Sequence, residues 1–371
     1  MGRALVERWL DWPQRRAADP AFRRWAERFP LTRWIARRRA RQLFDLVAGF
    51  VYSQVLLGCV QLGLFDRLAA GPLGVDPLAA TLRLPPERLR RLLDAAVALQ
   101  LLARRDGDRV ALGALGAAMV DNPAVAAMVQ HHAALYADLR DPVALLRGDT
   151  GPTQLGAVWP YAGSQSPASL SADAVAGYSR LMAASQPLVA DAVLDAWPDG
   201  HHRCLLDVGG GEGAFLEAVA RRHPGLELML FDLPAVAERA RQRLAPLGAR
   251  VRCVGGDFLR DALPRGADLI SLVRVVHDHD DGHVAALLRA AHDALPPGGT
   301  LLLAEPLADT PGAGAMGDAY FGCYLLAMGS GRPRSAEALT ALLQAAGFDR
   351  VRRIPTRVPL QTSVLVARRQ G

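Results

Sequence analysis

The side chains best suited to acid–base chemistry lie in the run His277-Asp-His-Asp-Asp281, directly after an apolar stretch over residues 268–276. Histidine has an unperturbed pKa of about 6.5 and is therefore available as a base at neutral pH. Glu305 ends a later apolar stretch, and a carboxylate at that point could orient His277 and stabilise its protonated form. The two residues predict a base with its supporting acid.

A glycine-rich run, Asp207-Val-Gly-Gly-Gly-Glu-Gly213, follows another apolar stretch. Glycine is needed where a side chain would keep the backbone away from a ligand, so the run predicts a cofactor loop that includes Asp207, Gly209 and Gly211. The spacing of Gly209, Gly211 and Ala214 also satisfies the dinucleotide pattern G-x-G-x-x-A. The loop alone therefore leaves two cofactor classes open.

Acidic residues after two further apolar runs extend this site. Asp232, followed by Leu233, is placed to accept hydrogen bonds from both hydroxyls of a ribose. Either cofactor class contains such a ribose. Gly256-Asp257-Phe258 offers an acid to an adenine amino group and a ring to its face, and Leu295-Pro-Pro-Gly-Gly299 precedes the next apolar run. This combination resembles the class I methyltransferases, which use S-adenosylmethionine, more than it resembles dinucleotide enzymes.

The chemistry expected at His277 follows from that cofactor. Methyl transfer is an in-line displacement at a sulfonium carbon, in which the enzyme aligns the acceptor oxygen and removes its proton. One base suffices and no metal is required. A divalent-metal site is the alternative, since carboxylates and imidazoles are ordinary ligands. In the metal-free interpretation His279 and His283 are exposed residues at the start of the next helix, which Asp280 and Asp281 cap.

The second half of the chain alternates apolar runs of strand length with helical patterns. Such periodicity predicts an α/β fold, a Rossmann-like, doubly wound and mostly parallel sheet with ligands at the carboxyl ends of its strands. The expected segments are 204–208, 215–222, 226–231, 235–244, 251–254, 268–273, 284–294 and 300–304.

The first half reads as helices over 43–68, 76–82 and 86–102, followed by a hairpin that turns at Asp106-Gly107. Helix, helix and hairpin form a winged-helix pattern, which in a transcription factor would read DNA. The flanking sequence adds little positive charge, so a scaffold is favoured over a DNA reader. A further helix is expected over 172–184, where Tyr178 and Met182 are candidate cofactor contacts.

Length and charge divide the chain into three parts. With 371 residues, two domains are expected after a basic arm: residues 1–40, 41–190 and 191–371. All 43 basic residues are Arg, which excludes Schiff-base lysine chemistry and a phosphate-loop lysine. The arm also holds Trp9, Trp12, Trp25 and Trp34, a composition suited to an anionic membrane interface. A solvated arm, or one packed on a partner subunit, is the other interpretation.

The stretch over residues 46–64 is apolar enough to suggest a membrane span, but its two Gln, its glycines and Ser53 favour a buried or subunit-facing helix. The four cysteines are far apart and contain no CxxC pair, which indicates a reducing compartment. We expect a cytoplasmic protein, with peripheral contact to the inner membrane through the arm.

The motifs between residues 206 and 348 are similar to those of small-molecule O-methyltransferases of the caffeate and hydroxyindole type. The resemblance implies a winged-helix domain that forms a homodimer, a His277 base supported by Glu305, and cofactor contacts from Asp232, Asp257, Phe258 and Arg274. Plant members have a second glutamate where this chain has Pro333, so a clamp of two carboxylates is in doubt.

A closer resemblance covers nearly the whole chain. The segments 28–32, 36–55 and 328–335, with the Val-Val-His-Asp-His-Asp run, are similar to the carotenoid O-methyltransferases of purple phototrophic bacteria. That resemblance implies methylation of the tertiary 1-hydroxyl of hydroxyneurosporene or demethylspheroidene, in the spheroidene pathway of a photosynthetic membrane. A soluble phenolic or polyketide acceptor, and a winged-helix regulator that senses the cofactor, remain the alternatives.

Overall fold

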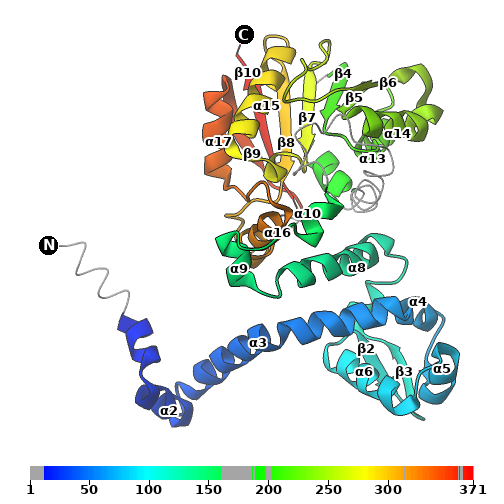
Figure 1. The fold of residues 1–371 in the computed structure, drawn as a ribbon, viewed down its shortest axis with the longest axis vertical. Helices are drawn as coiled ribbons and strands as arrows, with labels where there is room; N and C mark the ends of the chain where they lie inside the picture. Colours follow the sequence, from blue (N-terminus) through cyan, green and yellow to red (C-terminus); the bar gives the residue numbers. More distant parts are fainter. Residues whose placement is uncertain are drawn as a thin grey trace. The chain divides into compact units, whose positions relative to one another are not determined.

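The structure is a computed structural model that describes residues 12–159, 186, 189–197, 202–312, 314–357, 359 and 362–370. The chain divides into two compact units, Met1–Asn122 and Pro123–Gly371. Each unit is described by itself (Figure 1). The sequence suggested a boundary at residue 190, whereas the second compact unit begins at Pro123.

The first unit is mainly helical. Cys59 of the long helix α3 is buried with residues of α4, α5 and α6. Leu92 of α6 lies so near Gly58 that a Cβ built on Gly58 would be 3.4 Å from Leu92 Cδ1. Gly63, with φ 61°, breaks the single helix expected over 43–68 into α3 and α4. The elements are α2 (Pro20–Arg28), α3 (Arg33–Gln61), α4 (Leu64–Ala69), β1 (Leu73–Gly74), α5 (Val75–Leu82), α6 (Pro86–Ala98), β2 (Leu102–Arg105), β3 (Arg109–Leu112) and α7 (Ala114–Ala117).

The hairpin predicted at Asp106-Gly107 is present. Strands β2 and β3 pair antiparallel from Leu102↔Leu112 to Arg105↔Arg109, and β1 adds to the other edge of β3. Gly107 has φ 71°, a conformation that the tight turn requires and that glycine adopts without steric cost. The winged-helix pattern is thus formed by α5, α6 and this small sheet.

The second unit opens with three helices that pack against a helix from near its own end. Their residues Leu135, Leu145 and Leu155 share a buried cluster with Leu325 and Met328. This packing places residues from 123 onward in the second unit. The helices are α8 (Pro123–Asp138), α9 (Pro142–Arg147), α10 (Gln154–Val158) and α16 (Phe321–Met328).

The rest of the second unit is built on a seven-stranded sheet with the order β6-β5-β4-β7-β8-β10-β9. The first five of these strands are parallel, and β10 joins β8 and β9 antiparallel. The doubly wound, mostly parallel sheet is therefore confirmed. The strands are β4 (Cys204–Val208), β5 (Glu227–Asp232), β6 (Val251–Gly255), β7 (Leu269–Val273), β8 (Thr300–Glu305), β9 (Phe348–Ile354) and β10 (Ser363–Arg369).

Helices cover both faces of this sheet (Figure 1). One buried apolar cluster lies on each face. One cluster includes residues of α15 (Asp281–Ala294) and α17 (Ala336–Ala345). The other includes residues of α13 (Ala214–Arg222), α14 (Pro234–Leu244) and the helix over residues 189–195. The strand order reverses between the parallel strands β4 and β7, and ligands of open α/β sheets bind beyond the carboxyl ends of the strands at such a point.

Candidate active site at the carboxyl edge of the sheet

The glycine-rich loop after β4 is shaped by close neighbours. Gly209 has φ 68°, and its N–H donates to the Phe231 carbonyl at 2.8 Å. A Cβ on Gly209 would lie 2.8 Å from Val275 Cγ2, so the loop passes directly over the segment that leads to His277. Gly213, with φ 82°, begins α13 in similarly close contact with Leu244. The backbone is thus held in a left-handed path that only glycine follows easily.

Asp207 lies beneath this loop and is 1% exposed. Its Oδ1 accepts a hydrogen bond from Ser271 Oγ at 2.5 Å, while Oδ2 has no partner among the described residues. Desolvation raises the pKa of Asp207 to about 7. An orphaned buried oxygen under a glycine loop is a group that a polar ligand would satisfy.

Asp232 ends β5 and turns toward the same loop. Its Oδ2 accepts from the Gly211 N–H at 2.8 Å, and its Oδ1 accepts from the Leu233 N–H at 2.7 Å. Desolvation raises the pKa of Asp232 to about 6, although both backbone N–H groups favour the carboxylate. Each oxygen keeps a further lone pair, so the carboxylate can still accept from two hydroxyls.

Asp257 and Phe258 follow β6, at the same edge. Asp257 is 6% exposed, and its Oδ1 accepts from the Leu259 N–H at 2.9 Å, which fixes the turn. The Phe258 ring meets His279 edge-on, with centroids 5.2 Å apart. The pair is therefore rigidly placed, and its contact with adenine remains a prediction.

His277 lies in a short 3₁₀ helix, η3 (Val276–Asp278), just beyond β7. Its Nδ1 pairs with Glu305 Oε2 at the end of β8. Glu305 is 2% exposed, and its Oε1 accepts from the N–H groups of Val275 and Val276 at 3.0 and 2.7 Å. The glutamate thus holds both the imidazole and the backbone that carries it, and the predicted contact of His277 with Glu305 is present.

A second carboxylate, which the sequence did not single out, completes the cluster. Asp278 Oδ1 lies 3.1 Å from His277 Nε2, and both residues are buried. Burial opposes charge on His277, but the carboxylates of Asp278 and Glu305 outweigh it and raise its pKa above the usual value. Desolvation raises the pKa of Asp278 to about 6. The sequence signal that could have identified Asp278 is its position directly after the candidate base His277.

Arg274 stands between β7 and this turn. Its φ is 59°, and its N–H donates to the Ala304 carbonyl at 2.9 Å. Desolvation raises the pKa of Asp278 and of Tyr320, and the charge of Arg274 offsets part of that rise. The same charge opposes protonation of His277. The structure thus relates Arg274 to the base, while its predicted contact with the cofactor stays a prediction.

The expectation for the residues after His277 is partly wrong. His279 is not an exposed helix-start residue: its ring packs on Phe258, and desolvation lowers its pKa to about 4. Asp280 makes no side-chain cap, and its Oδ1 accepts from the Gly331 N–H at 3.2 Å. Asp281 pairs with arginines from the segment after α16 instead. The sequence around Asp280 and Asp281 does not show that residues of the segment after α16 bind these carboxylates in place of the helix N-terminus.

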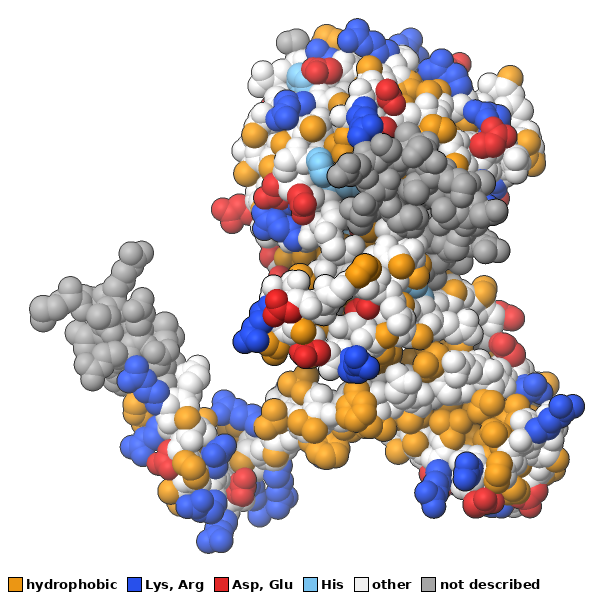
Figure 2. All heavy atoms as spheres, viewed as in Figure 1, with side chains coloured by type: hydrophobic (Ala, Val, Ile, Leu, Met, Phe, Trp, Pro, Cys, Tyr) orange, Lys and Arg blue, Asp and Glu red, His pale blue; other side chains and the backbone are white. Residues whose placement is uncertain are grey.

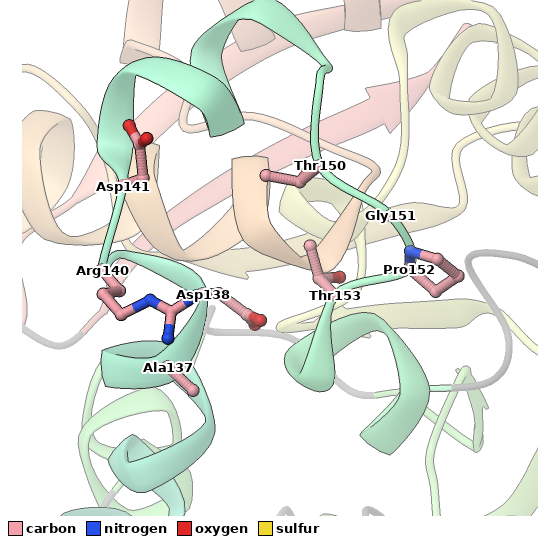
Figure 3. Close-up of a pocket in the computed structure, with 8 residues that line it drawn as sticks. All are labelled: Ala137, Asp138, Arg140, Asp141, Thr150, Gly151, Pro152 and Thr153. Carbon is pink, nitrogen blue, oxygen red and sulfur yellow. The ribbon is translucent and has the colours of Figure 1, made fainter.

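Two candidate cofactor contacts cannot be placed in this cluster, and the hollow near α8 lies away from it. Tyr178 and Met182 lie outside the described residues. A hollow of about 300 Å³ lies at the end of α8 (Figure 3). Asp138 lines it, but both of its carboxylate oxygens already accept hydrogen bonds at 2.8 Å from the N–H groups of Gln154 and Leu155. Its lining includes none of the predicted site residues: Ala137, Asp138, Arg140, Asp141, Thr150, Gly151, Pro152 and Thr153.

One of the three arginines of α6, the helix that would read DNA, forms ion pairs within the first unit. Arg90 of α6 bonds to Asp76 and Asp108, and Arg104 of β2 pairs with Asp94. A DNA reader needs free cationic side chains along such a helix. These pairings favour the scaffold interpretation of the first unit.

Two kinds of exposed apolar surface lie on the first unit. The middle of α3 presents large side chains, among them Leu43, Phe44, Leu46, Val47 and Phe50, and hydrophobic atoms run along this helix (Figure 2). Trp12 and Trp25, which precede α3, and Trp34 in its first turn are also exposed. By length and composition α3 is one helix that could cross a membrane, a test that a signal sequence or a core helix also passes.

Comparison with known proteins gives two family models. The O-methyltransferase domain matches residues 136–349, and the O-methyltransferase dimerisation domain matches residues 44–122. Two relatives are named demethylspheroidene O-methyltransferase. That of Cereibacter sphaeroides is 46% identical and covers 95% of this chain and 93% of its own. That of Rhodobacter capsulatus is 43% identical and covers 92% and 86%. The solved structure of human N-acetylserotonin methyltransferase with SAM is 26% identical, with a TM-score of 0.72, and covers 90% of this chain and 98% of that chain.

Proposed function

The chain belongs to the S-adenosylmethionine-dependent O-methyltransferase family, and from that premise we propose that it methylates the tertiary 1-hydroxyl of an acyclic carotenoid. The observation that carries the proposed chemistry is the buried His277, held between Glu305 and Asp278. The substrate rests on the two demethylspheroidene O-methyltransferases, which are 43% and 46% identical over most of their length.

The carboxyl edge of the sheet fits the cofactor. The left-handed glycine loop leaves main chain accessible, and among the described residues no atom lies within 4 Å of a Cβ built on Gly211. Asp232 would hold the ribose hydroxyls, and Asp257 with Phe258 would hold the adenine. When bound, S-adenosylmethionine supplies a methyl group on a sulfonium, which needs no further activation.

The protein's own part is to orient the acceptor and take its proton. Glu305 accepts from Nδ1 of His277, which leaves Nε2 as the basic nitrogen. A tertiary alcohol is a poor acid, so His277 acts as its oxygen gains the methyl group rather than beforehand. Asp278 and Glu305 then stabilise the imidazolium. Burial of the three residues keeps water from competing as acceptor.

Replacement of His277 tests this proposal. The His277→Ala variant should lose turnover with 1-hydroxy carotenoid acceptors while it still binds S-adenosylmethionine, measured by calorimetry. His283→Ala is the matched control, because His283 is exposed on the first turn of α15. A His277→Ala enzyme with a near-normal rate would exclude the base role. Product analysis with a soluble phenol beside the carotenoid decides the substrate, and preference for the phenol would exclude the carotenoid.

A second copy of this chain is the proposed occupant of the apolar face of α3. The dimerisation-domain match begins at residue 44 and covers most of this face, and Leu57 and Cys59 are the only residues of α3 that are buried. Light scattering of the full chain should give a dimer mass. A monomer at micromolar concentration would refute this part of the proposal.

The arm is proposed to bind the surface of the inner, photosynthetic membrane from the cytoplasm. Trp12, Trp25 and Trp34 are exposed beside many arginines, and Trp25 stacks on Phe29 with centroids 4.9 Å apart. Tryptophan suits headgroup depth, and arginine binds lipid phosphate. Deletion of residues 1–34 should weaken binding to anionic liposomes without changing the circular dichroism of the rest. Unchanged binding would favour an arm that is solvated or packed on the partner.

A further inference from the structure

Every carbonyl of the turn that carries His277 is held by one distant segment. The segment is Ser330–Arg334, and the turn comprises residues 276–279. The bonds are Arg334 Nη1 to Val276 O at 2.9 Å, Arg332 N to His277 O at 2.9 Å, Ser330 Oγ to Asp278 O at 2.9 Å, and Arg334 Nη2 to His279 O at 2.7 Å. Glu305 holds N–H groups of the same stretch, so the turn is fixed from two sides.

Arg334 is the centre of this segment. Its side chain is 1% exposed, and its guanidinium bonds to Val276 O, His279 O, Arg332 O and Asp281 Oδ1. These contacts use all five of its N–H donors. Burying a charge is unfavourable unless it is paired and fully hydrogen-bonded, so this site is built for arginine.

The neighbours of Arg334 fit the same purpose. Gly331 has φ 82°, and a Cβ there would lie 2.1 Å from His277 O. Asp281 balances the arginine charge, and hydrogen bonds from Arg332 and Arg334 lower its pKa to about 2. The segment itself carries Pro333 and no carboxylate. It therefore acts on the turn through main-chain carbonyls and not on the imidazole directly.

Arg334 also ties the turn to the strand that bears Glu305. The Ala308 N–H donates to the Arg334 carbonyl at 3.0 Å, and Leu307 forms a bridge with Arg334. Leu307 lies two residues after Glu305. A shift of Arg334 would therefore move the turn relative to the end of β8, and with it the contact of His277 with Glu305.

We propose that Arg334 is a positioning residue, which sets the orientation of His277 toward the acceptor oxygen by binding the carbonyls of its turn. This inference rests on the proposed role of His277 as base. An error of about 1 Å in the placement of a reacting group costs on the order of 100-fold in rate. Cofactor binding, which involves other residues, should be unaffected.

Kinetics of Arg334→Lys and Arg334→Ala, in the full-length enzyme with the carotenoid acceptor, test the proposal. We expect kcat to fall about 10- to 100-fold, with KM for S-adenosylmethionine within about twofold. The pH dependence of kcat should also shift, since the contacts that set the pKa of His277 change. Arg250→Lys is the matched control: Arg250 likewise binds three carbonyls, those of Ala220, His223 and Leu226, at the start of β6.

The outcomes separate cleanly. A folded Arg334→Lys enzyme with normal kcat and pH profile overturns the proposal, as does an Arg250→Lys enzyme with the same loss of kcat and shifted pH profile. If neither Arg334 variant binds S-adenosylmethionine, the residue is structural and the proposal also fails. His277→Ala in the same series distinguishes the two hypotheses. An active His277→Ala enzyme would exclude His277 as the base. An inactive His277→Ala enzyme beside a normal Arg334→Lys enzyme would exclude only the positioning role of Arg334.

Discussion

Substitution of Glu305 by Gln would isolate the charge that supports the base. The change keeps the size of the side chain, and the remaining amide oxygen can still accept from Val275 and Val276. The amide nitrogen that replaces Oε2 is a donor, so it cannot accept from Nδ1 of His277. The variant therefore loses the acceptor that fixes the tautomer with a basic Nε2.

The size of the effect follows from burial. Glu305 is 2% and His277 8% exposed, so water screens their contact little. A hydrogen bond to a charged group contributes about 1.5–3 kcal/mol. At about 1.4 kcal/mol for each tenfold in rate, this corresponds to a fall in kcat of roughly 10- to 100-fold. The wrong tautomer would lower kcat further.

The pH profile gives the second test. The neutral imidazole is the active form, so kcat should rise with pH through the raised pKa of His277. Because Glu305 helps to raise that pKa, Glu305→Gln should move the acid limb to lower pH while the plateau falls. Initial rates between pH 5 and 9, with S-adenosylmethionine affinity as the control for folding, measure both. A variant with a wild-type plateau and an unmoved limb would refute the reasoning.

Three further changes test neighbouring parts of the site. Asp278→Asn should lower the pKa of His277 and move the acid limb of kcat to lower pH; an unmoved limb would contradict their coupling. Asp232→Asn should weaken S-adenosylmethionine about 10- to 100-fold by calorimetry, and wild-type affinity should itself decline below about pH 6 as Asp232 gains a proton. Gly331→Ala should lower the melting temperature more than Gly329→Ala. Both glycines have positive φ, a conformation that destabilises a residue with a Cβ by about 1–2 kcal/mol. Only at position 331 would the added Cβ also clash with the His277 carbonyl. Equal losses would exclude the contact.

The repeating parts of the fold were predictable because periodicity is local. The strand expected over 204–208 is β4 to the residue, and the helix expected over 235–244 differs from α14 by one residue. The acids at strand ends were found for the same reason, since a parallel sheet gathers its carboxyl ends at one edge. His277 and Glu305 meet because β7 and β8 are neighbours.

What the sequence did not reveal depends on contacts between distant segments. Nothing near Arg334 shows that it binds carbonyls 55 to 58 residues away in sequence. The ring contact of His279 with Phe258 joins it to another strand end. The break at Gly63 was missed because an isolated glycine is also tolerated within helices.

The exposed apolar face of α3 has a consequence for how this enzyme is handled. If a second copy covers that face, folding and association are linked by mass action. The free energy of unfolding then depends on the protein concentration as well as on the sequence. Dilution would then lower the melting temperature and the specific activity together. Assays at nanomolar enzyme would report a weaker catalyst than assays at micromolar enzyme, although no residue of the active site had changed.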